Sequence, residues 1–363
     1  MRDLKIGLLN KKRGNFELQE KFAGKDNVVD KTYEEIDHHS KALLEIGYKF
    51  AIINWGPDFI SSLEKEKIDL AFNVSSMVEA AVLEELKIPY VGSDVYTIAL
   101  STNKEMAKRI WQQTGLPTSP FHTARSEEEC RIFKENPLFD YPLFVKPMAG
   151  RGSSGIDSNS IVKNYEQLIY AVERIYNNME QPALIEKFLR GKEITLGVLG
   201  NNDEARVLSS LEIICKKGDP VLTYEQKKLD DEEYIEYVCP AELSPAEKSM
   251  MESLALNAYH SLGFKDFGRI DTVLTKEGPS ILEANTFAGL GCSPEKKDRS
   301  YIGFMAMEQG MDGKELLDKV IQIATKRYGS LLIPKPEIKP TPYAEEIVLT
   351  GEIPLKSLRT VEY

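Results

Sequence analysis

Three kinds of signal are missing from this chain of 363 residues. No apolar run approaches the roughly eighteen residues that a membrane-spanning helix needs, so we expect no membrane partner. The chain runs directly into the short strand-like stretch 4–9 without the long apolar core of a signal peptide, which favours a cytoplasmic protein. Positive charge is not in excess: the formal net charge of −11 argues against nucleic acid as the main partner.

Cysteine and histidine are scarce, and neither forms a metal-binding or catalytic pattern. The four cysteines show no CxxC pair or other metal spacing, which favours reduced thiols in a cytoplasm. The four histidines lie in no zinc-like or triad-like setting. His38 and His39 fall in a polar helical stretch, where we expect both on the surface. The cysteines are Cys130, Cys215, Cys239 and Cys292.

The first hundred residues do contain a regular alternation of short apolar strands with amphipathic helices. This alternation predicts a doubly wound parallel α/β sheet. Ligands of such sheets bind beyond the carboxyl ends of the strands, so Asn54 and Asn73 are candidate site residues, with ordinary loop polar groups as the alternative. The expected strands are 5–9, 50–54, 70–73 and 89–91, and the expected helices are 33–46, 59–66 and 78–86.

Beyond residue 100 the pattern changes to longer helices and antiparallel strands. The helix expected at 101–114 has Ser101 as its N-cap and carries Lys104. The polar stretch 222–237 is interpreted as a loop over a site, or as a solvated surface loop. Further helices are expected at 126–134, 164–177, 244–262, 299–307 and 314–328, and strands at 141–147, 183–186, 194–199 and 205–214.

A lysine precedes the glycine-rich loop 148–156. The loop contains the pattern GxGxxG, but a Rossmann site requires a helix directly afterwards, and here a turn leads into a second strand. The Walker pattern is absent as well. Instead, a strand that ends in Lys146 is followed by the loop and then by a second strand. This order is typical of a flap whose amides and hydroxyls could cradle phosphates while Lys146 supplies charge. A plain flexible hairpin is the alternative.

The stretch Gly268–Gly291 reads as a β-hairpin with acids on one face. Alternation along the strands places Arg269 opposite Asn285 if the hairpin folds symmetrically. Asp271 then lies opposite Glu283. Two carboxylates that face each other across a ladder repel, and a hard divalent cation with oxygen ligands would offset that repulsion. A solvated surface hairpin is the alternative.

Five motifs with regular spacing run through roughly residues 85–325. They read IPYVGSD with ALSTNKEMAKRIWQQTGLPT, then FVKPMAGRGSSGI, LIEKFLRGKEITLGVLG, YEQKKL, and finally DFGR with LEANTFAGL. Together they resemble the D-alanine–D-alanine ligase family of the ATP-grasp superfamily. The resemblance implies a mixed α/β and α+β architecture, in which an ATP-grasp fold follows an N-terminal doubly wound parallel-sheet domain.

The resemblance also implies how the chain is divided. An N-terminal pre-ATP-grasp domain would occupy 1–100, and a central ATP-grasp subdomain with the flap 101–182. A C-terminal subdomain with the metal and substrate sites would occupy 183–330, followed by a proline-containing arm at 331–363. A homodimer is implied by the habit of the family.

The same resemblance implies which residues would bind the phosphates, the adenine and the ribose of ATP. The phosphates would be contacted by Lys104, Lys146 and Lys227 and covered by Ser153 and Ser154; the adenine would be held by Glu186 with the backbone of Lys187 and Leu189, and the ribose by Glu193.

The resemblance further implies a metal site and a reaction. Two magnesium ions, with Mn²⁺ as a substitute, would bind Asp271, Glu283 and Asn285. Arg269 and the amide of Gly289 would stabilise the oxyanion, and Ser300 would bind the carboxylate of the second substrate. The implied reaction joins a small carboxylate to an amine, both amino acids or short peptides, through an acyl phosphate with release of ADP.

Two loops depart from the family pattern, both where the first substrate would bind. A GGxSxE-type loop is replaced by the sequence LNKKRG at 9–14, and an HGxxGED-type loop by the shorter stretch 74–79. We therefore predict a ligase with a divergent first-substrate pocket. The basic residues 11–13 indicate an anionic or larger acyl donor, or a solvated turn. An authentic D-alanine–D-alanine ligase of peptidoglycan synthesis and a non-ligating ATP-binding module are the alternatives.

Overall fold

The computed structural model describes residues 4–10, 31–150, 154–216, 234–293, 295 and 299–329. Some predictions fall outside these residues. They concern Ser153, Lys227, the basic stretch 11–13, most of the polar stretch 222–237 and the arm 331–363.

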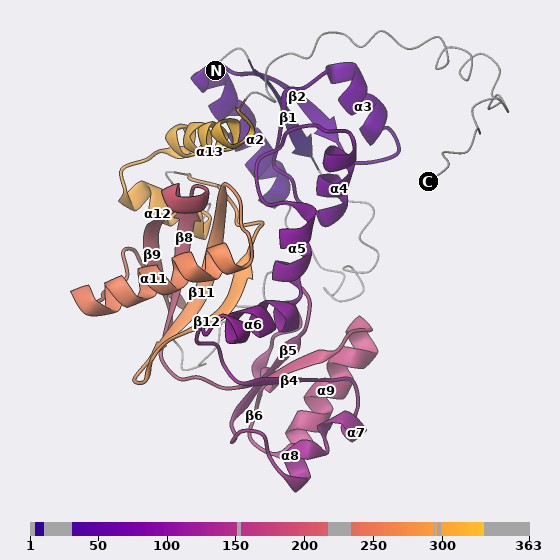
Figure 1. Ribbon diagram of the computed structural model, residues 1–363, viewed down its shortest axis with the longest axis vertical. Helices are drawn as coiled ribbons and strands as arrows, with labels where there is room; N and C mark the ends of the chain where they lie inside the picture. Colours follow the sequence, from indigo (N-terminus) through magenta and orange to yellow (C-terminus); the bar gives the residue numbers. More distant parts are fainter. Residues whose placement is uncertain are drawn as a thin grey trace, which may run out of the picture.

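The N-terminal unit is the α/β sheet that the alternation predicts (Figure 1). Its three strands are parallel, in the order β2-β1-β3, and the fourth expected strand is reduced to a bridge between Ala71 and Tyr90. Buried residues of α3 and α4 pack on one face of the sheet and those of α2 and α13 on the other. The elements are β1 (Lys5–Asn10), α2 (Lys31–Ile46), β2 (Lys49–Asn54), α3 (Phe59–Glu66), β3 (Leu70–Phe72) and α4 (Met77–Glu85).

The central unit is a four-stranded sheet of order β4-β7-β5-β6, and β5 and β6 form the antiparallel pair expected around the flap. Its strands are β4 (Phe121–Ala124), β5 (Leu143–Pro147), β6 (Ile161–Val162) and β7 (Ala183–Lys187). Its helices are α7 (Glu127–Cys130), α8 (Ile132–Glu135) and α9 (Tyr165–Met179). Two helices that precede it in the chain, α5 (Val95–Thr102) and α6 (Lys104–Gln113), pack instead on the N-terminal and C-terminal units.

The predicted helix 101–114 is wrong at its start. The chain forms two helices, α5 and α6, and Ser101 lies inside the first of them. Asn103 has extended backbone angles, and its side chain accepts a hydrogen bond from the amide of Met106 at 3.1 Å. Asn103 is therefore the N-cap that starts α6 at Lys104, a position where free backbone amides face outward from the helix.

The C-terminal unit is a five-stranded antiparallel sheet of order β10-β9-β8-β11-β12, with α11 and α12 packed against it. Ser244 caps α11. The strands are β8 (Lys192–Leu199), β9 (Arg206–Cys215), β10 (Ile235–Val238), β11 (Phe267–Thr275) and β12 (Gly278–Asn285). The helices are α11 (Pro245–Ser261), α12 (Tyr301–Glu308) and α13 (Gly313–Tyr328).

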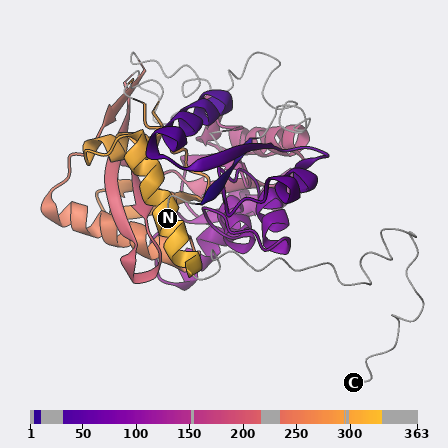
Figure 2. The same cartoon turned by 90° about the horizontal axis from the view of Figure 1, so that it is seen from above.

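The N-terminal and C-terminal units share one hydrophobic core. Buried side chains of β1 and α2 pack with those of α12 and α13, and Figure 2 shows α13 lying against the N-terminal elements. Arg327 of α13 adds a polar link, because it pairs with the buried carboxylate of Asp266 at 2.6 Å and donates to the carbonyl of Tyr90 at 2.9 Å. No helix within the described residues is both long and apolar enough to cross a membrane.

Candidate active site

The acidic hairpin has the predicted pairing. Arg269 lies opposite Asn285, and Asp271 lies opposite Glu283. A bulge between Asp271 and Thr272 then shifts the register, so the strands close over a shorter tip than a fully symmetric hairpin would have. The four functional side chains lie on the side of the bulge away from the tip, and β11, which carries Arg269 and Asp271, pairs with β8.

Protein donors surround the carboxylate of Asp271. Arg269 donates Nε and Nη2 to it at 2.8 and 2.9 Å, and Asn285 donates Nδ2 at 2.9 Å. Thr195, its neighbour across the β8–β11 ladder, donates its hydroxyl at 2.5 Å. Burial alone lowers the pKa of Arg269, but the Asp271 carboxylate outweighs this and raises it, so the guanidinium is charged. Sequence reasoning missed Thr195 because no local pattern shows that β8 pairs with β11.

The donor set of the hairpin suits magnesium. Among the described residues no three His, Cys, Asp or Glu side chains gather in one place, so two carboxylates and one amide are what the hairpin offers. Mg²⁺ takes oxygen ligands, usually one or two carboxylates, and completes its shell with water and phosphate oxygens. Asp271, Glu283 and Asn285 fit that requirement. A site in which the protein supplied every ligand would need more oxygen atoms than these three side chains offer.

Opposite the hairpin lies a cluster of buried lysines around Glu186 of β7. Lys146 of β5 pairs with Glu186 at 2.7 Å and Lys108 of α6 pairs with its other oxygen at 2.6 Å. Lys104 lies 3.9 Å from Glu283. The three lysines and Glu186 are all buried. Glu283 and Glu193 also act on Lys146, so three lysines face three carboxylates, and bound magnesium ions would supply the further positive charge that an anionic ligand needs.

The pKa directions in this cluster follow from burial and pairing. Burial raises the pKa of Glu186, but Lys108 and Lys146 outweigh it and the net direction is downward. Burial lowers the pKa of Lys146, which Glu186 and Glu283 reverse. Burial also lowers the pKa of Lys104, and Glu283 and Glu186 offset this only in part because the neighbouring Lys146 acts in the same direction as burial. A phosphate brought to Lys104 would favour its charged form.

Glu186 is engaged on both oxygens by lysines, so its carboxylate holds Lys146 in place. A contact between Glu186 and adenine stays a prediction. Lys108 was not among the sequence candidates, although it follows Lys104 by one helical turn on the buried face of α6. That i, i+4 spacing beside the buried Ala107 and Trp111 was the signal that could have identified it.

The flap begins at the N-terminus of α6. The backbone amide of Lys104 donates to Met148 at 3.1 Å and its ammonium to the carbonyl of Gly150 at 3.0 Å. Gly155 has a φ of +75°, and a Cβ there would lie 2.6 Å from the ring of Pro147, so only glycine fits. Ser154 is half-buried beside it. These contacts bring the start of the loop to the lysine cluster.

The backbone that leaves β7 crosses from the central sheet to the C-terminal sheet. Lys187 donates its amide to Pro120 at 3.0 Å, and its carbonyl accepts from the hydroxyl of Ser119 at 2.6 Å. Glu193 lies further on, in β8 opposite Val273 of β11. The adenine and ribose contacts expected of Lys187, Leu189 and Glu193 stay predictions, on a segment that borders both sheets.

Ser300 is the N-cap of α12. Its hydroxyl donates to the carbonyl of Gly291 at 2.9 Å and accepts from the amide of Gly303 at 3.0 Å. The hydroxyl proton is therefore already used in the fold, and the contact with a substrate carboxylate stays a prediction. Tyr301, the next residue, lies under the guanidinium of Arg269 at 4.8 Å from the ring centroid.

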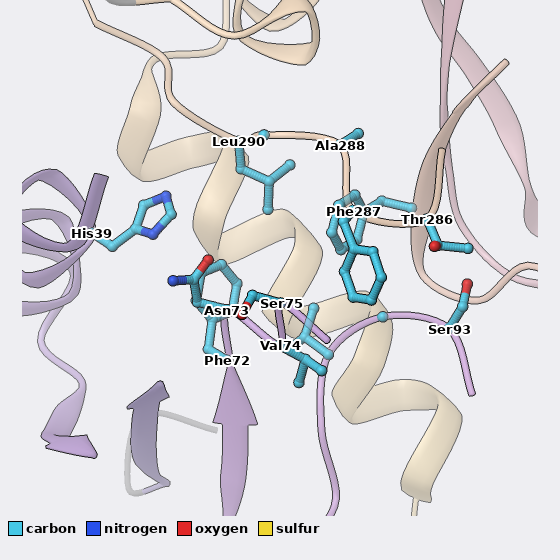
Figure 3. Close-up of a pocket in the computed structure, with 14 residues that line it drawn as sticks. His39, Phe72, Asn73, Val74, Ser75, Ser93, Thr286, Phe287, Ala288 and Leu290 are labelled. Carbon is cyan, nitrogen blue, oxygen red and sulfur yellow. The ribbon is translucent and has the colours of Figure 1, made fainter. Parts of the chain in front are cut away.

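A cavity of about 150 Å³ adjoins this site, between the N-terminal unit and the loop after β12 (Figure 3). Asn73 lines it, as the strand-end argument predicts, whereas Asn54 accepts a hydrogen bond from Asn10 instead. His39 also lines it, so the prediction that His39 is a surface residue is wrong. The lining consists of His39, Phe72, Asn73, Val74, Ser75, Val91, Gly92, Ser93, Phe267, Thr286, Phe287, Ala288, Gly289 and Leu290.

The position of His39 follows from the amphipathic character of α2. Ile36, His39 and Leu43 occupy the buried face at helical spacing, while His38 is exposed. The polar composition of the stretch hid this period. Glu79, in the shortened loop, does not face the cavity with a free carboxylate, because that group accepts hydrogen bonds from Ser75 and Ser76 at the start of α4.

Two antiparallel sheets that meet around buried lysines and an acidic hairpin define a nucleotide-binding ligase of the ATP-grasp class. A family model described as "D-ala D-ala ligase C-terminus" matches residues 110–322. The chain therefore belongs to the D-alanine–D-alanine ligase family, whose members are ADP-forming C–N ligases.

Named relatives agree with this family. The D-alanine–D-alanine ligase of Bordetella avium is 31% identical over 293 residues, which are 78% of this chain and 87% of that protein. The enzyme of Pelotomaculum thermopropionicum is 30% identical over 304 residues, or 79% and 90% of the two chains. The structure of D-alanine–D-alanine ligase from Bacillus anthracis complexed with ATP has the same fold, with a TM-score of 0.67 at 20% identity, over 89% of this chain and 98% of that one.

Proposed function

We propose that this protein joins a carboxylate to an amine with ATP as the energy source, through an acyl phosphate, and that its preferred acyl donor is not D-alanine. The observation that carries the proposal is the buried lysine cluster facing the acidic hairpin, with Lys104 3.9 Å from Glu283. This arrangement suits a triphosphate whose terminal phosphoryl group is to be transferred, since positioning and charge stabilisation dominate such reactions.

The residues divide into two groups by what they would hold. Lys104 and Lys146 would bind the phosphates, with Lys108 and Glu186 behind them keeping Lys146 in position. Asp271, Glu283 and Asn285 would hold two magnesium ions, which neutralise the triphosphate when bound.

The chemistry is a sequence of two substitutions. An oxygen of the donor carboxylate attacks the γ-phosphorus, the bond to ADP breaks, and an acyl phosphate forms. The nitrogen of the amine then attacks the acyl carbon, phosphate leaves with the former carboxylate oxygen, and the nitrogen loses a proton. Arg269, fixed by Asp271, and the amide of Gly289 would stabilise the charge that develops on the carbonyl oxygen.

The proposal of a different acyl donor is supported by the shortened loop 74–79. Its buried Glu79 is used to cap α4, and the cavity beyond it is lined by apolar and neutral polar side chains. A second candidate, an authentic D-alanine–D-alanine ligase, is favoured by the relatives at 30–31% identity, which carry that name. Assembly as a homodimer also stays a proposal.

ADP release over a panel of amino acids and small carboxylates separates the candidates. The proposed function predicts ADP release that depends on both a carboxylate and an amine and is slow with D-alanine alone. Rapid release with D-alanine alone would favour the second candidate. ADP release with no partner, or none with any pair, would indicate an ATP-binding module that does not ligate.

A further inference from the structure

His39 presents a buried imidazole to the cavity beside the proposed reaction centre. Its side chain is 3% exposed, and the ring packs edge-on against Phe72 with the centroids 5.3 Å apart. Within the part of the chain that the structure describes, neither Nδ1 nor Nε2 has a hydrogen-bond partner. Buried polar groups are nearly always paired, so an unpaired imidazole that borders a cavity indicates a partner supplied by a ligand.

The cavity lining has no formal charge. The structure describes fourteen lining residues. Thirteen of them are apolar or neutral polar, and the other, His39, is titratable. Burial, with a smaller effect of the neighbouring His38, lowers the pKa of His39 to about 4, so its imidazole is neutral at pH 7. A neutral imidazole offers one donor and one acceptor, which suits a hydroxyl or an amide.

The size of the cavity sets the size of the group it takes. An apolar cavity of about 150 Å³ holds a benzene-sized ligand, and the volume found here is about 150 Å³. A methyl group would leave most of that space unfilled. Phe72 and Phe287 on the walls suit the apolar part of the larger group, and Figure 3 shows His39 and Asn73 together on one side of the cavity.

The cavity also adjoins the reacting atoms. Thr286 follows the proposed metal ligand Asn285 directly, and Gly289, whose amide would stabilise the oxyanion, is part of the lining. A donor whose carboxylate lies at Gly289 therefore directs its side group toward α2. His39 reaches that side group from a different unit of the fold.

We propose that the cavity receives the side group of the acyl donor and that His39 is a specificity-determining residue, which hydrogen-bonds an uncharged polar atom at the end of that group. The preferred donors are carboxylic acids with a side group of roughly six or more non-hydrogen atoms, apolar along its length and ending in a hydroxyl or an amide. This inference rests on the proposed ligase function.

The test compares matched donors that differ in the polar atom. The donors are tyrosine against phenylalanine and 3-hydroxyphenylalanine against phenylalanine, in both enantiomers, with D-alanine as the amine and ADP release as the signal. The wild-type protein should prefer the polar member of a pair by about tenfold or more in kcat/KM, because an unpaired polar group in the pocket disfavours the apolar one.

Two variants at one position and one control isolate the role of His39. His39→Phe should bring the ratio within a pair close to one while KM for ATP stays unchanged, and His39→Gln should retain part of the preference. His38→Phe, on the exposed side of the same helix, should leave the ratio as it is. An unchanged ratio in His39→Phe, or a wild-type protein that accepts only alanine, would overturn the inference.

A binding measurement keeps the two proposals separable. Isothermal titration of the same acids, with magnesium and a non-hydrolysable ATP analogue, needs no turnover. Binding that His39→Phe weakens, without ADP release from ATP, would support the cavity and His39 as a binding site for the acid and reject the ligase function. Equal affinity of the acids for the wild type and for His39→Phe, or no binding to either protein, would reject the inference even if ADP release is found.

Discussion

Asp271 lies at the centre of the hydrogen bonds in the acidic hairpin. Its carboxylate is the counter-charge of Arg269 and also accepts from Asn285 and Thr195. The carboxylate of Asp271 thus balances the charge of Arg269 and also belongs to the proposed metal site. We therefore expect the negative charge of Asp271 to matter more than the shape of its side chain.

Replacing Asp271 by asparagine keeps the shape and removes the charge. We expect Asp271→Asn to lower ADP release by about 100-fold or more, because both the metal site and the position of Arg269 depend on the carboxylate. Far-UV circular dichroism should match that of the wild type. Asp203→Asn, at an acid in the turn between β8 and β9, serves as the control and should be fully active. Unchanged activity in Asp271→Asn would refute the metal assignment.

His39 should give the stability of the protein a distinct pH dependence. The unfolded chain binds a proton at this residue below its ordinary pKa of 6.5, whereas the folded protein does so only near pH 4. Between these values the unfolded state carries more protons, so stability falls as pH falls. The difference amounts to about 3 kcal/mol at pH 4.

Urea unfolding of the wild type and of His39→Phe at pH 7, 6, 5 and 4 measures this contribution. The free energy of unfolding of the His39→Phe variant should rise relative to the wild type by about 3 kcal/mol between pH 7 and pH 4. His38→Phe should keep most of the pH dependence of the wild type, because burial is the larger cause of the lowered pKa of His39. Parallel curves for His39→Phe and the wild type would show that the imidazole is not buried in its neutral form.

Much of the candidate site could be predicted from the sequence, because Asp271, Glu283 and Asn285 lie on a hairpin whose two strands are close in the chain. Alternation and a short turn were enough to place them. Thr195 was missed because its partner Asp271 comes from a distant strand. Lys108 and His39 lie at helical spacing among buried residues, but their polar side chains hid that period. The pairing of β8 with β11, which brings Thr195 to Asp271, leaves no local period in the sequence.

At the scale of elements, α6 connects the flap, the central sheet and the lysine cluster. Lys108 on its buried face pairs with Glu186, while Arg109 on its exposed face pairs with Glu105. The two ion pairs lie on neighbouring residues of one helix and differ in burial, which makes them a matched test of what burial does.

Replacing Lys108 by methionine should leave Glu186 with only Lys146 as its partner. Since breaking a buried pair exposes a charge to an apolar environment, we expect Lys108→Met to lower the free energy of unfolding by about 3 kcal/mol. KM for ATP should rise with it. Arg109→Met is the control and should cost under about 1 kcal/mol. Equal effects of the two substitutions in urea unfolding would contradict the role given to Lys108.

Element boundaries show where prediction from sequence stops. Helix α3 was predicted at its observed limits, since its period, length and flanking residues agree. The break between α5 and α6 was missed, because Asn103 ends one helix and caps the next without any glycine or proline. The bulge after Asp271 was missed because Ile281 and Leu282 are both apolar, so the sequence does not show which of them pairs with Thr272.

At the scale of the whole molecule, the shared core makes the N-terminal and C-terminal units one structure. Arg327 contributes a buried polar link between them, through Asp266 and the carbonyls of Tyr90 and Gly92. Because those carbonyls lie next to the cavity residues Val91 and Ser93, the link also fixes one wall of the proposed donor pocket.

Arg327→Met should therefore destabilise the entire protein. Asp266 is fully buried, so we expect a loss of about 3 kcal/mol in the free energy of unfolding, seen as one cooperative transition at lower urea. Lys326→Met removes an exposed pair with Glu204 on the adjacent residue and should change little. A separate early transition in Arg327→Met would mean that the two units unfold independently.

The most direct test of the central claim follows the oxygen of the donor carboxylate. The donor that supports the fastest ADP release is labelled with ¹⁸O in its carboxyl group, and the inorganic phosphate is examined by mass spectrometry after turnover with ATP, magnesium and the amine. An acyl phosphate predicts that the phosphate carries one ¹⁸O atom from the carboxylate. Unlabelled phosphate would contradict the account, since it would mean that ATP is hydrolysed without activating the donor.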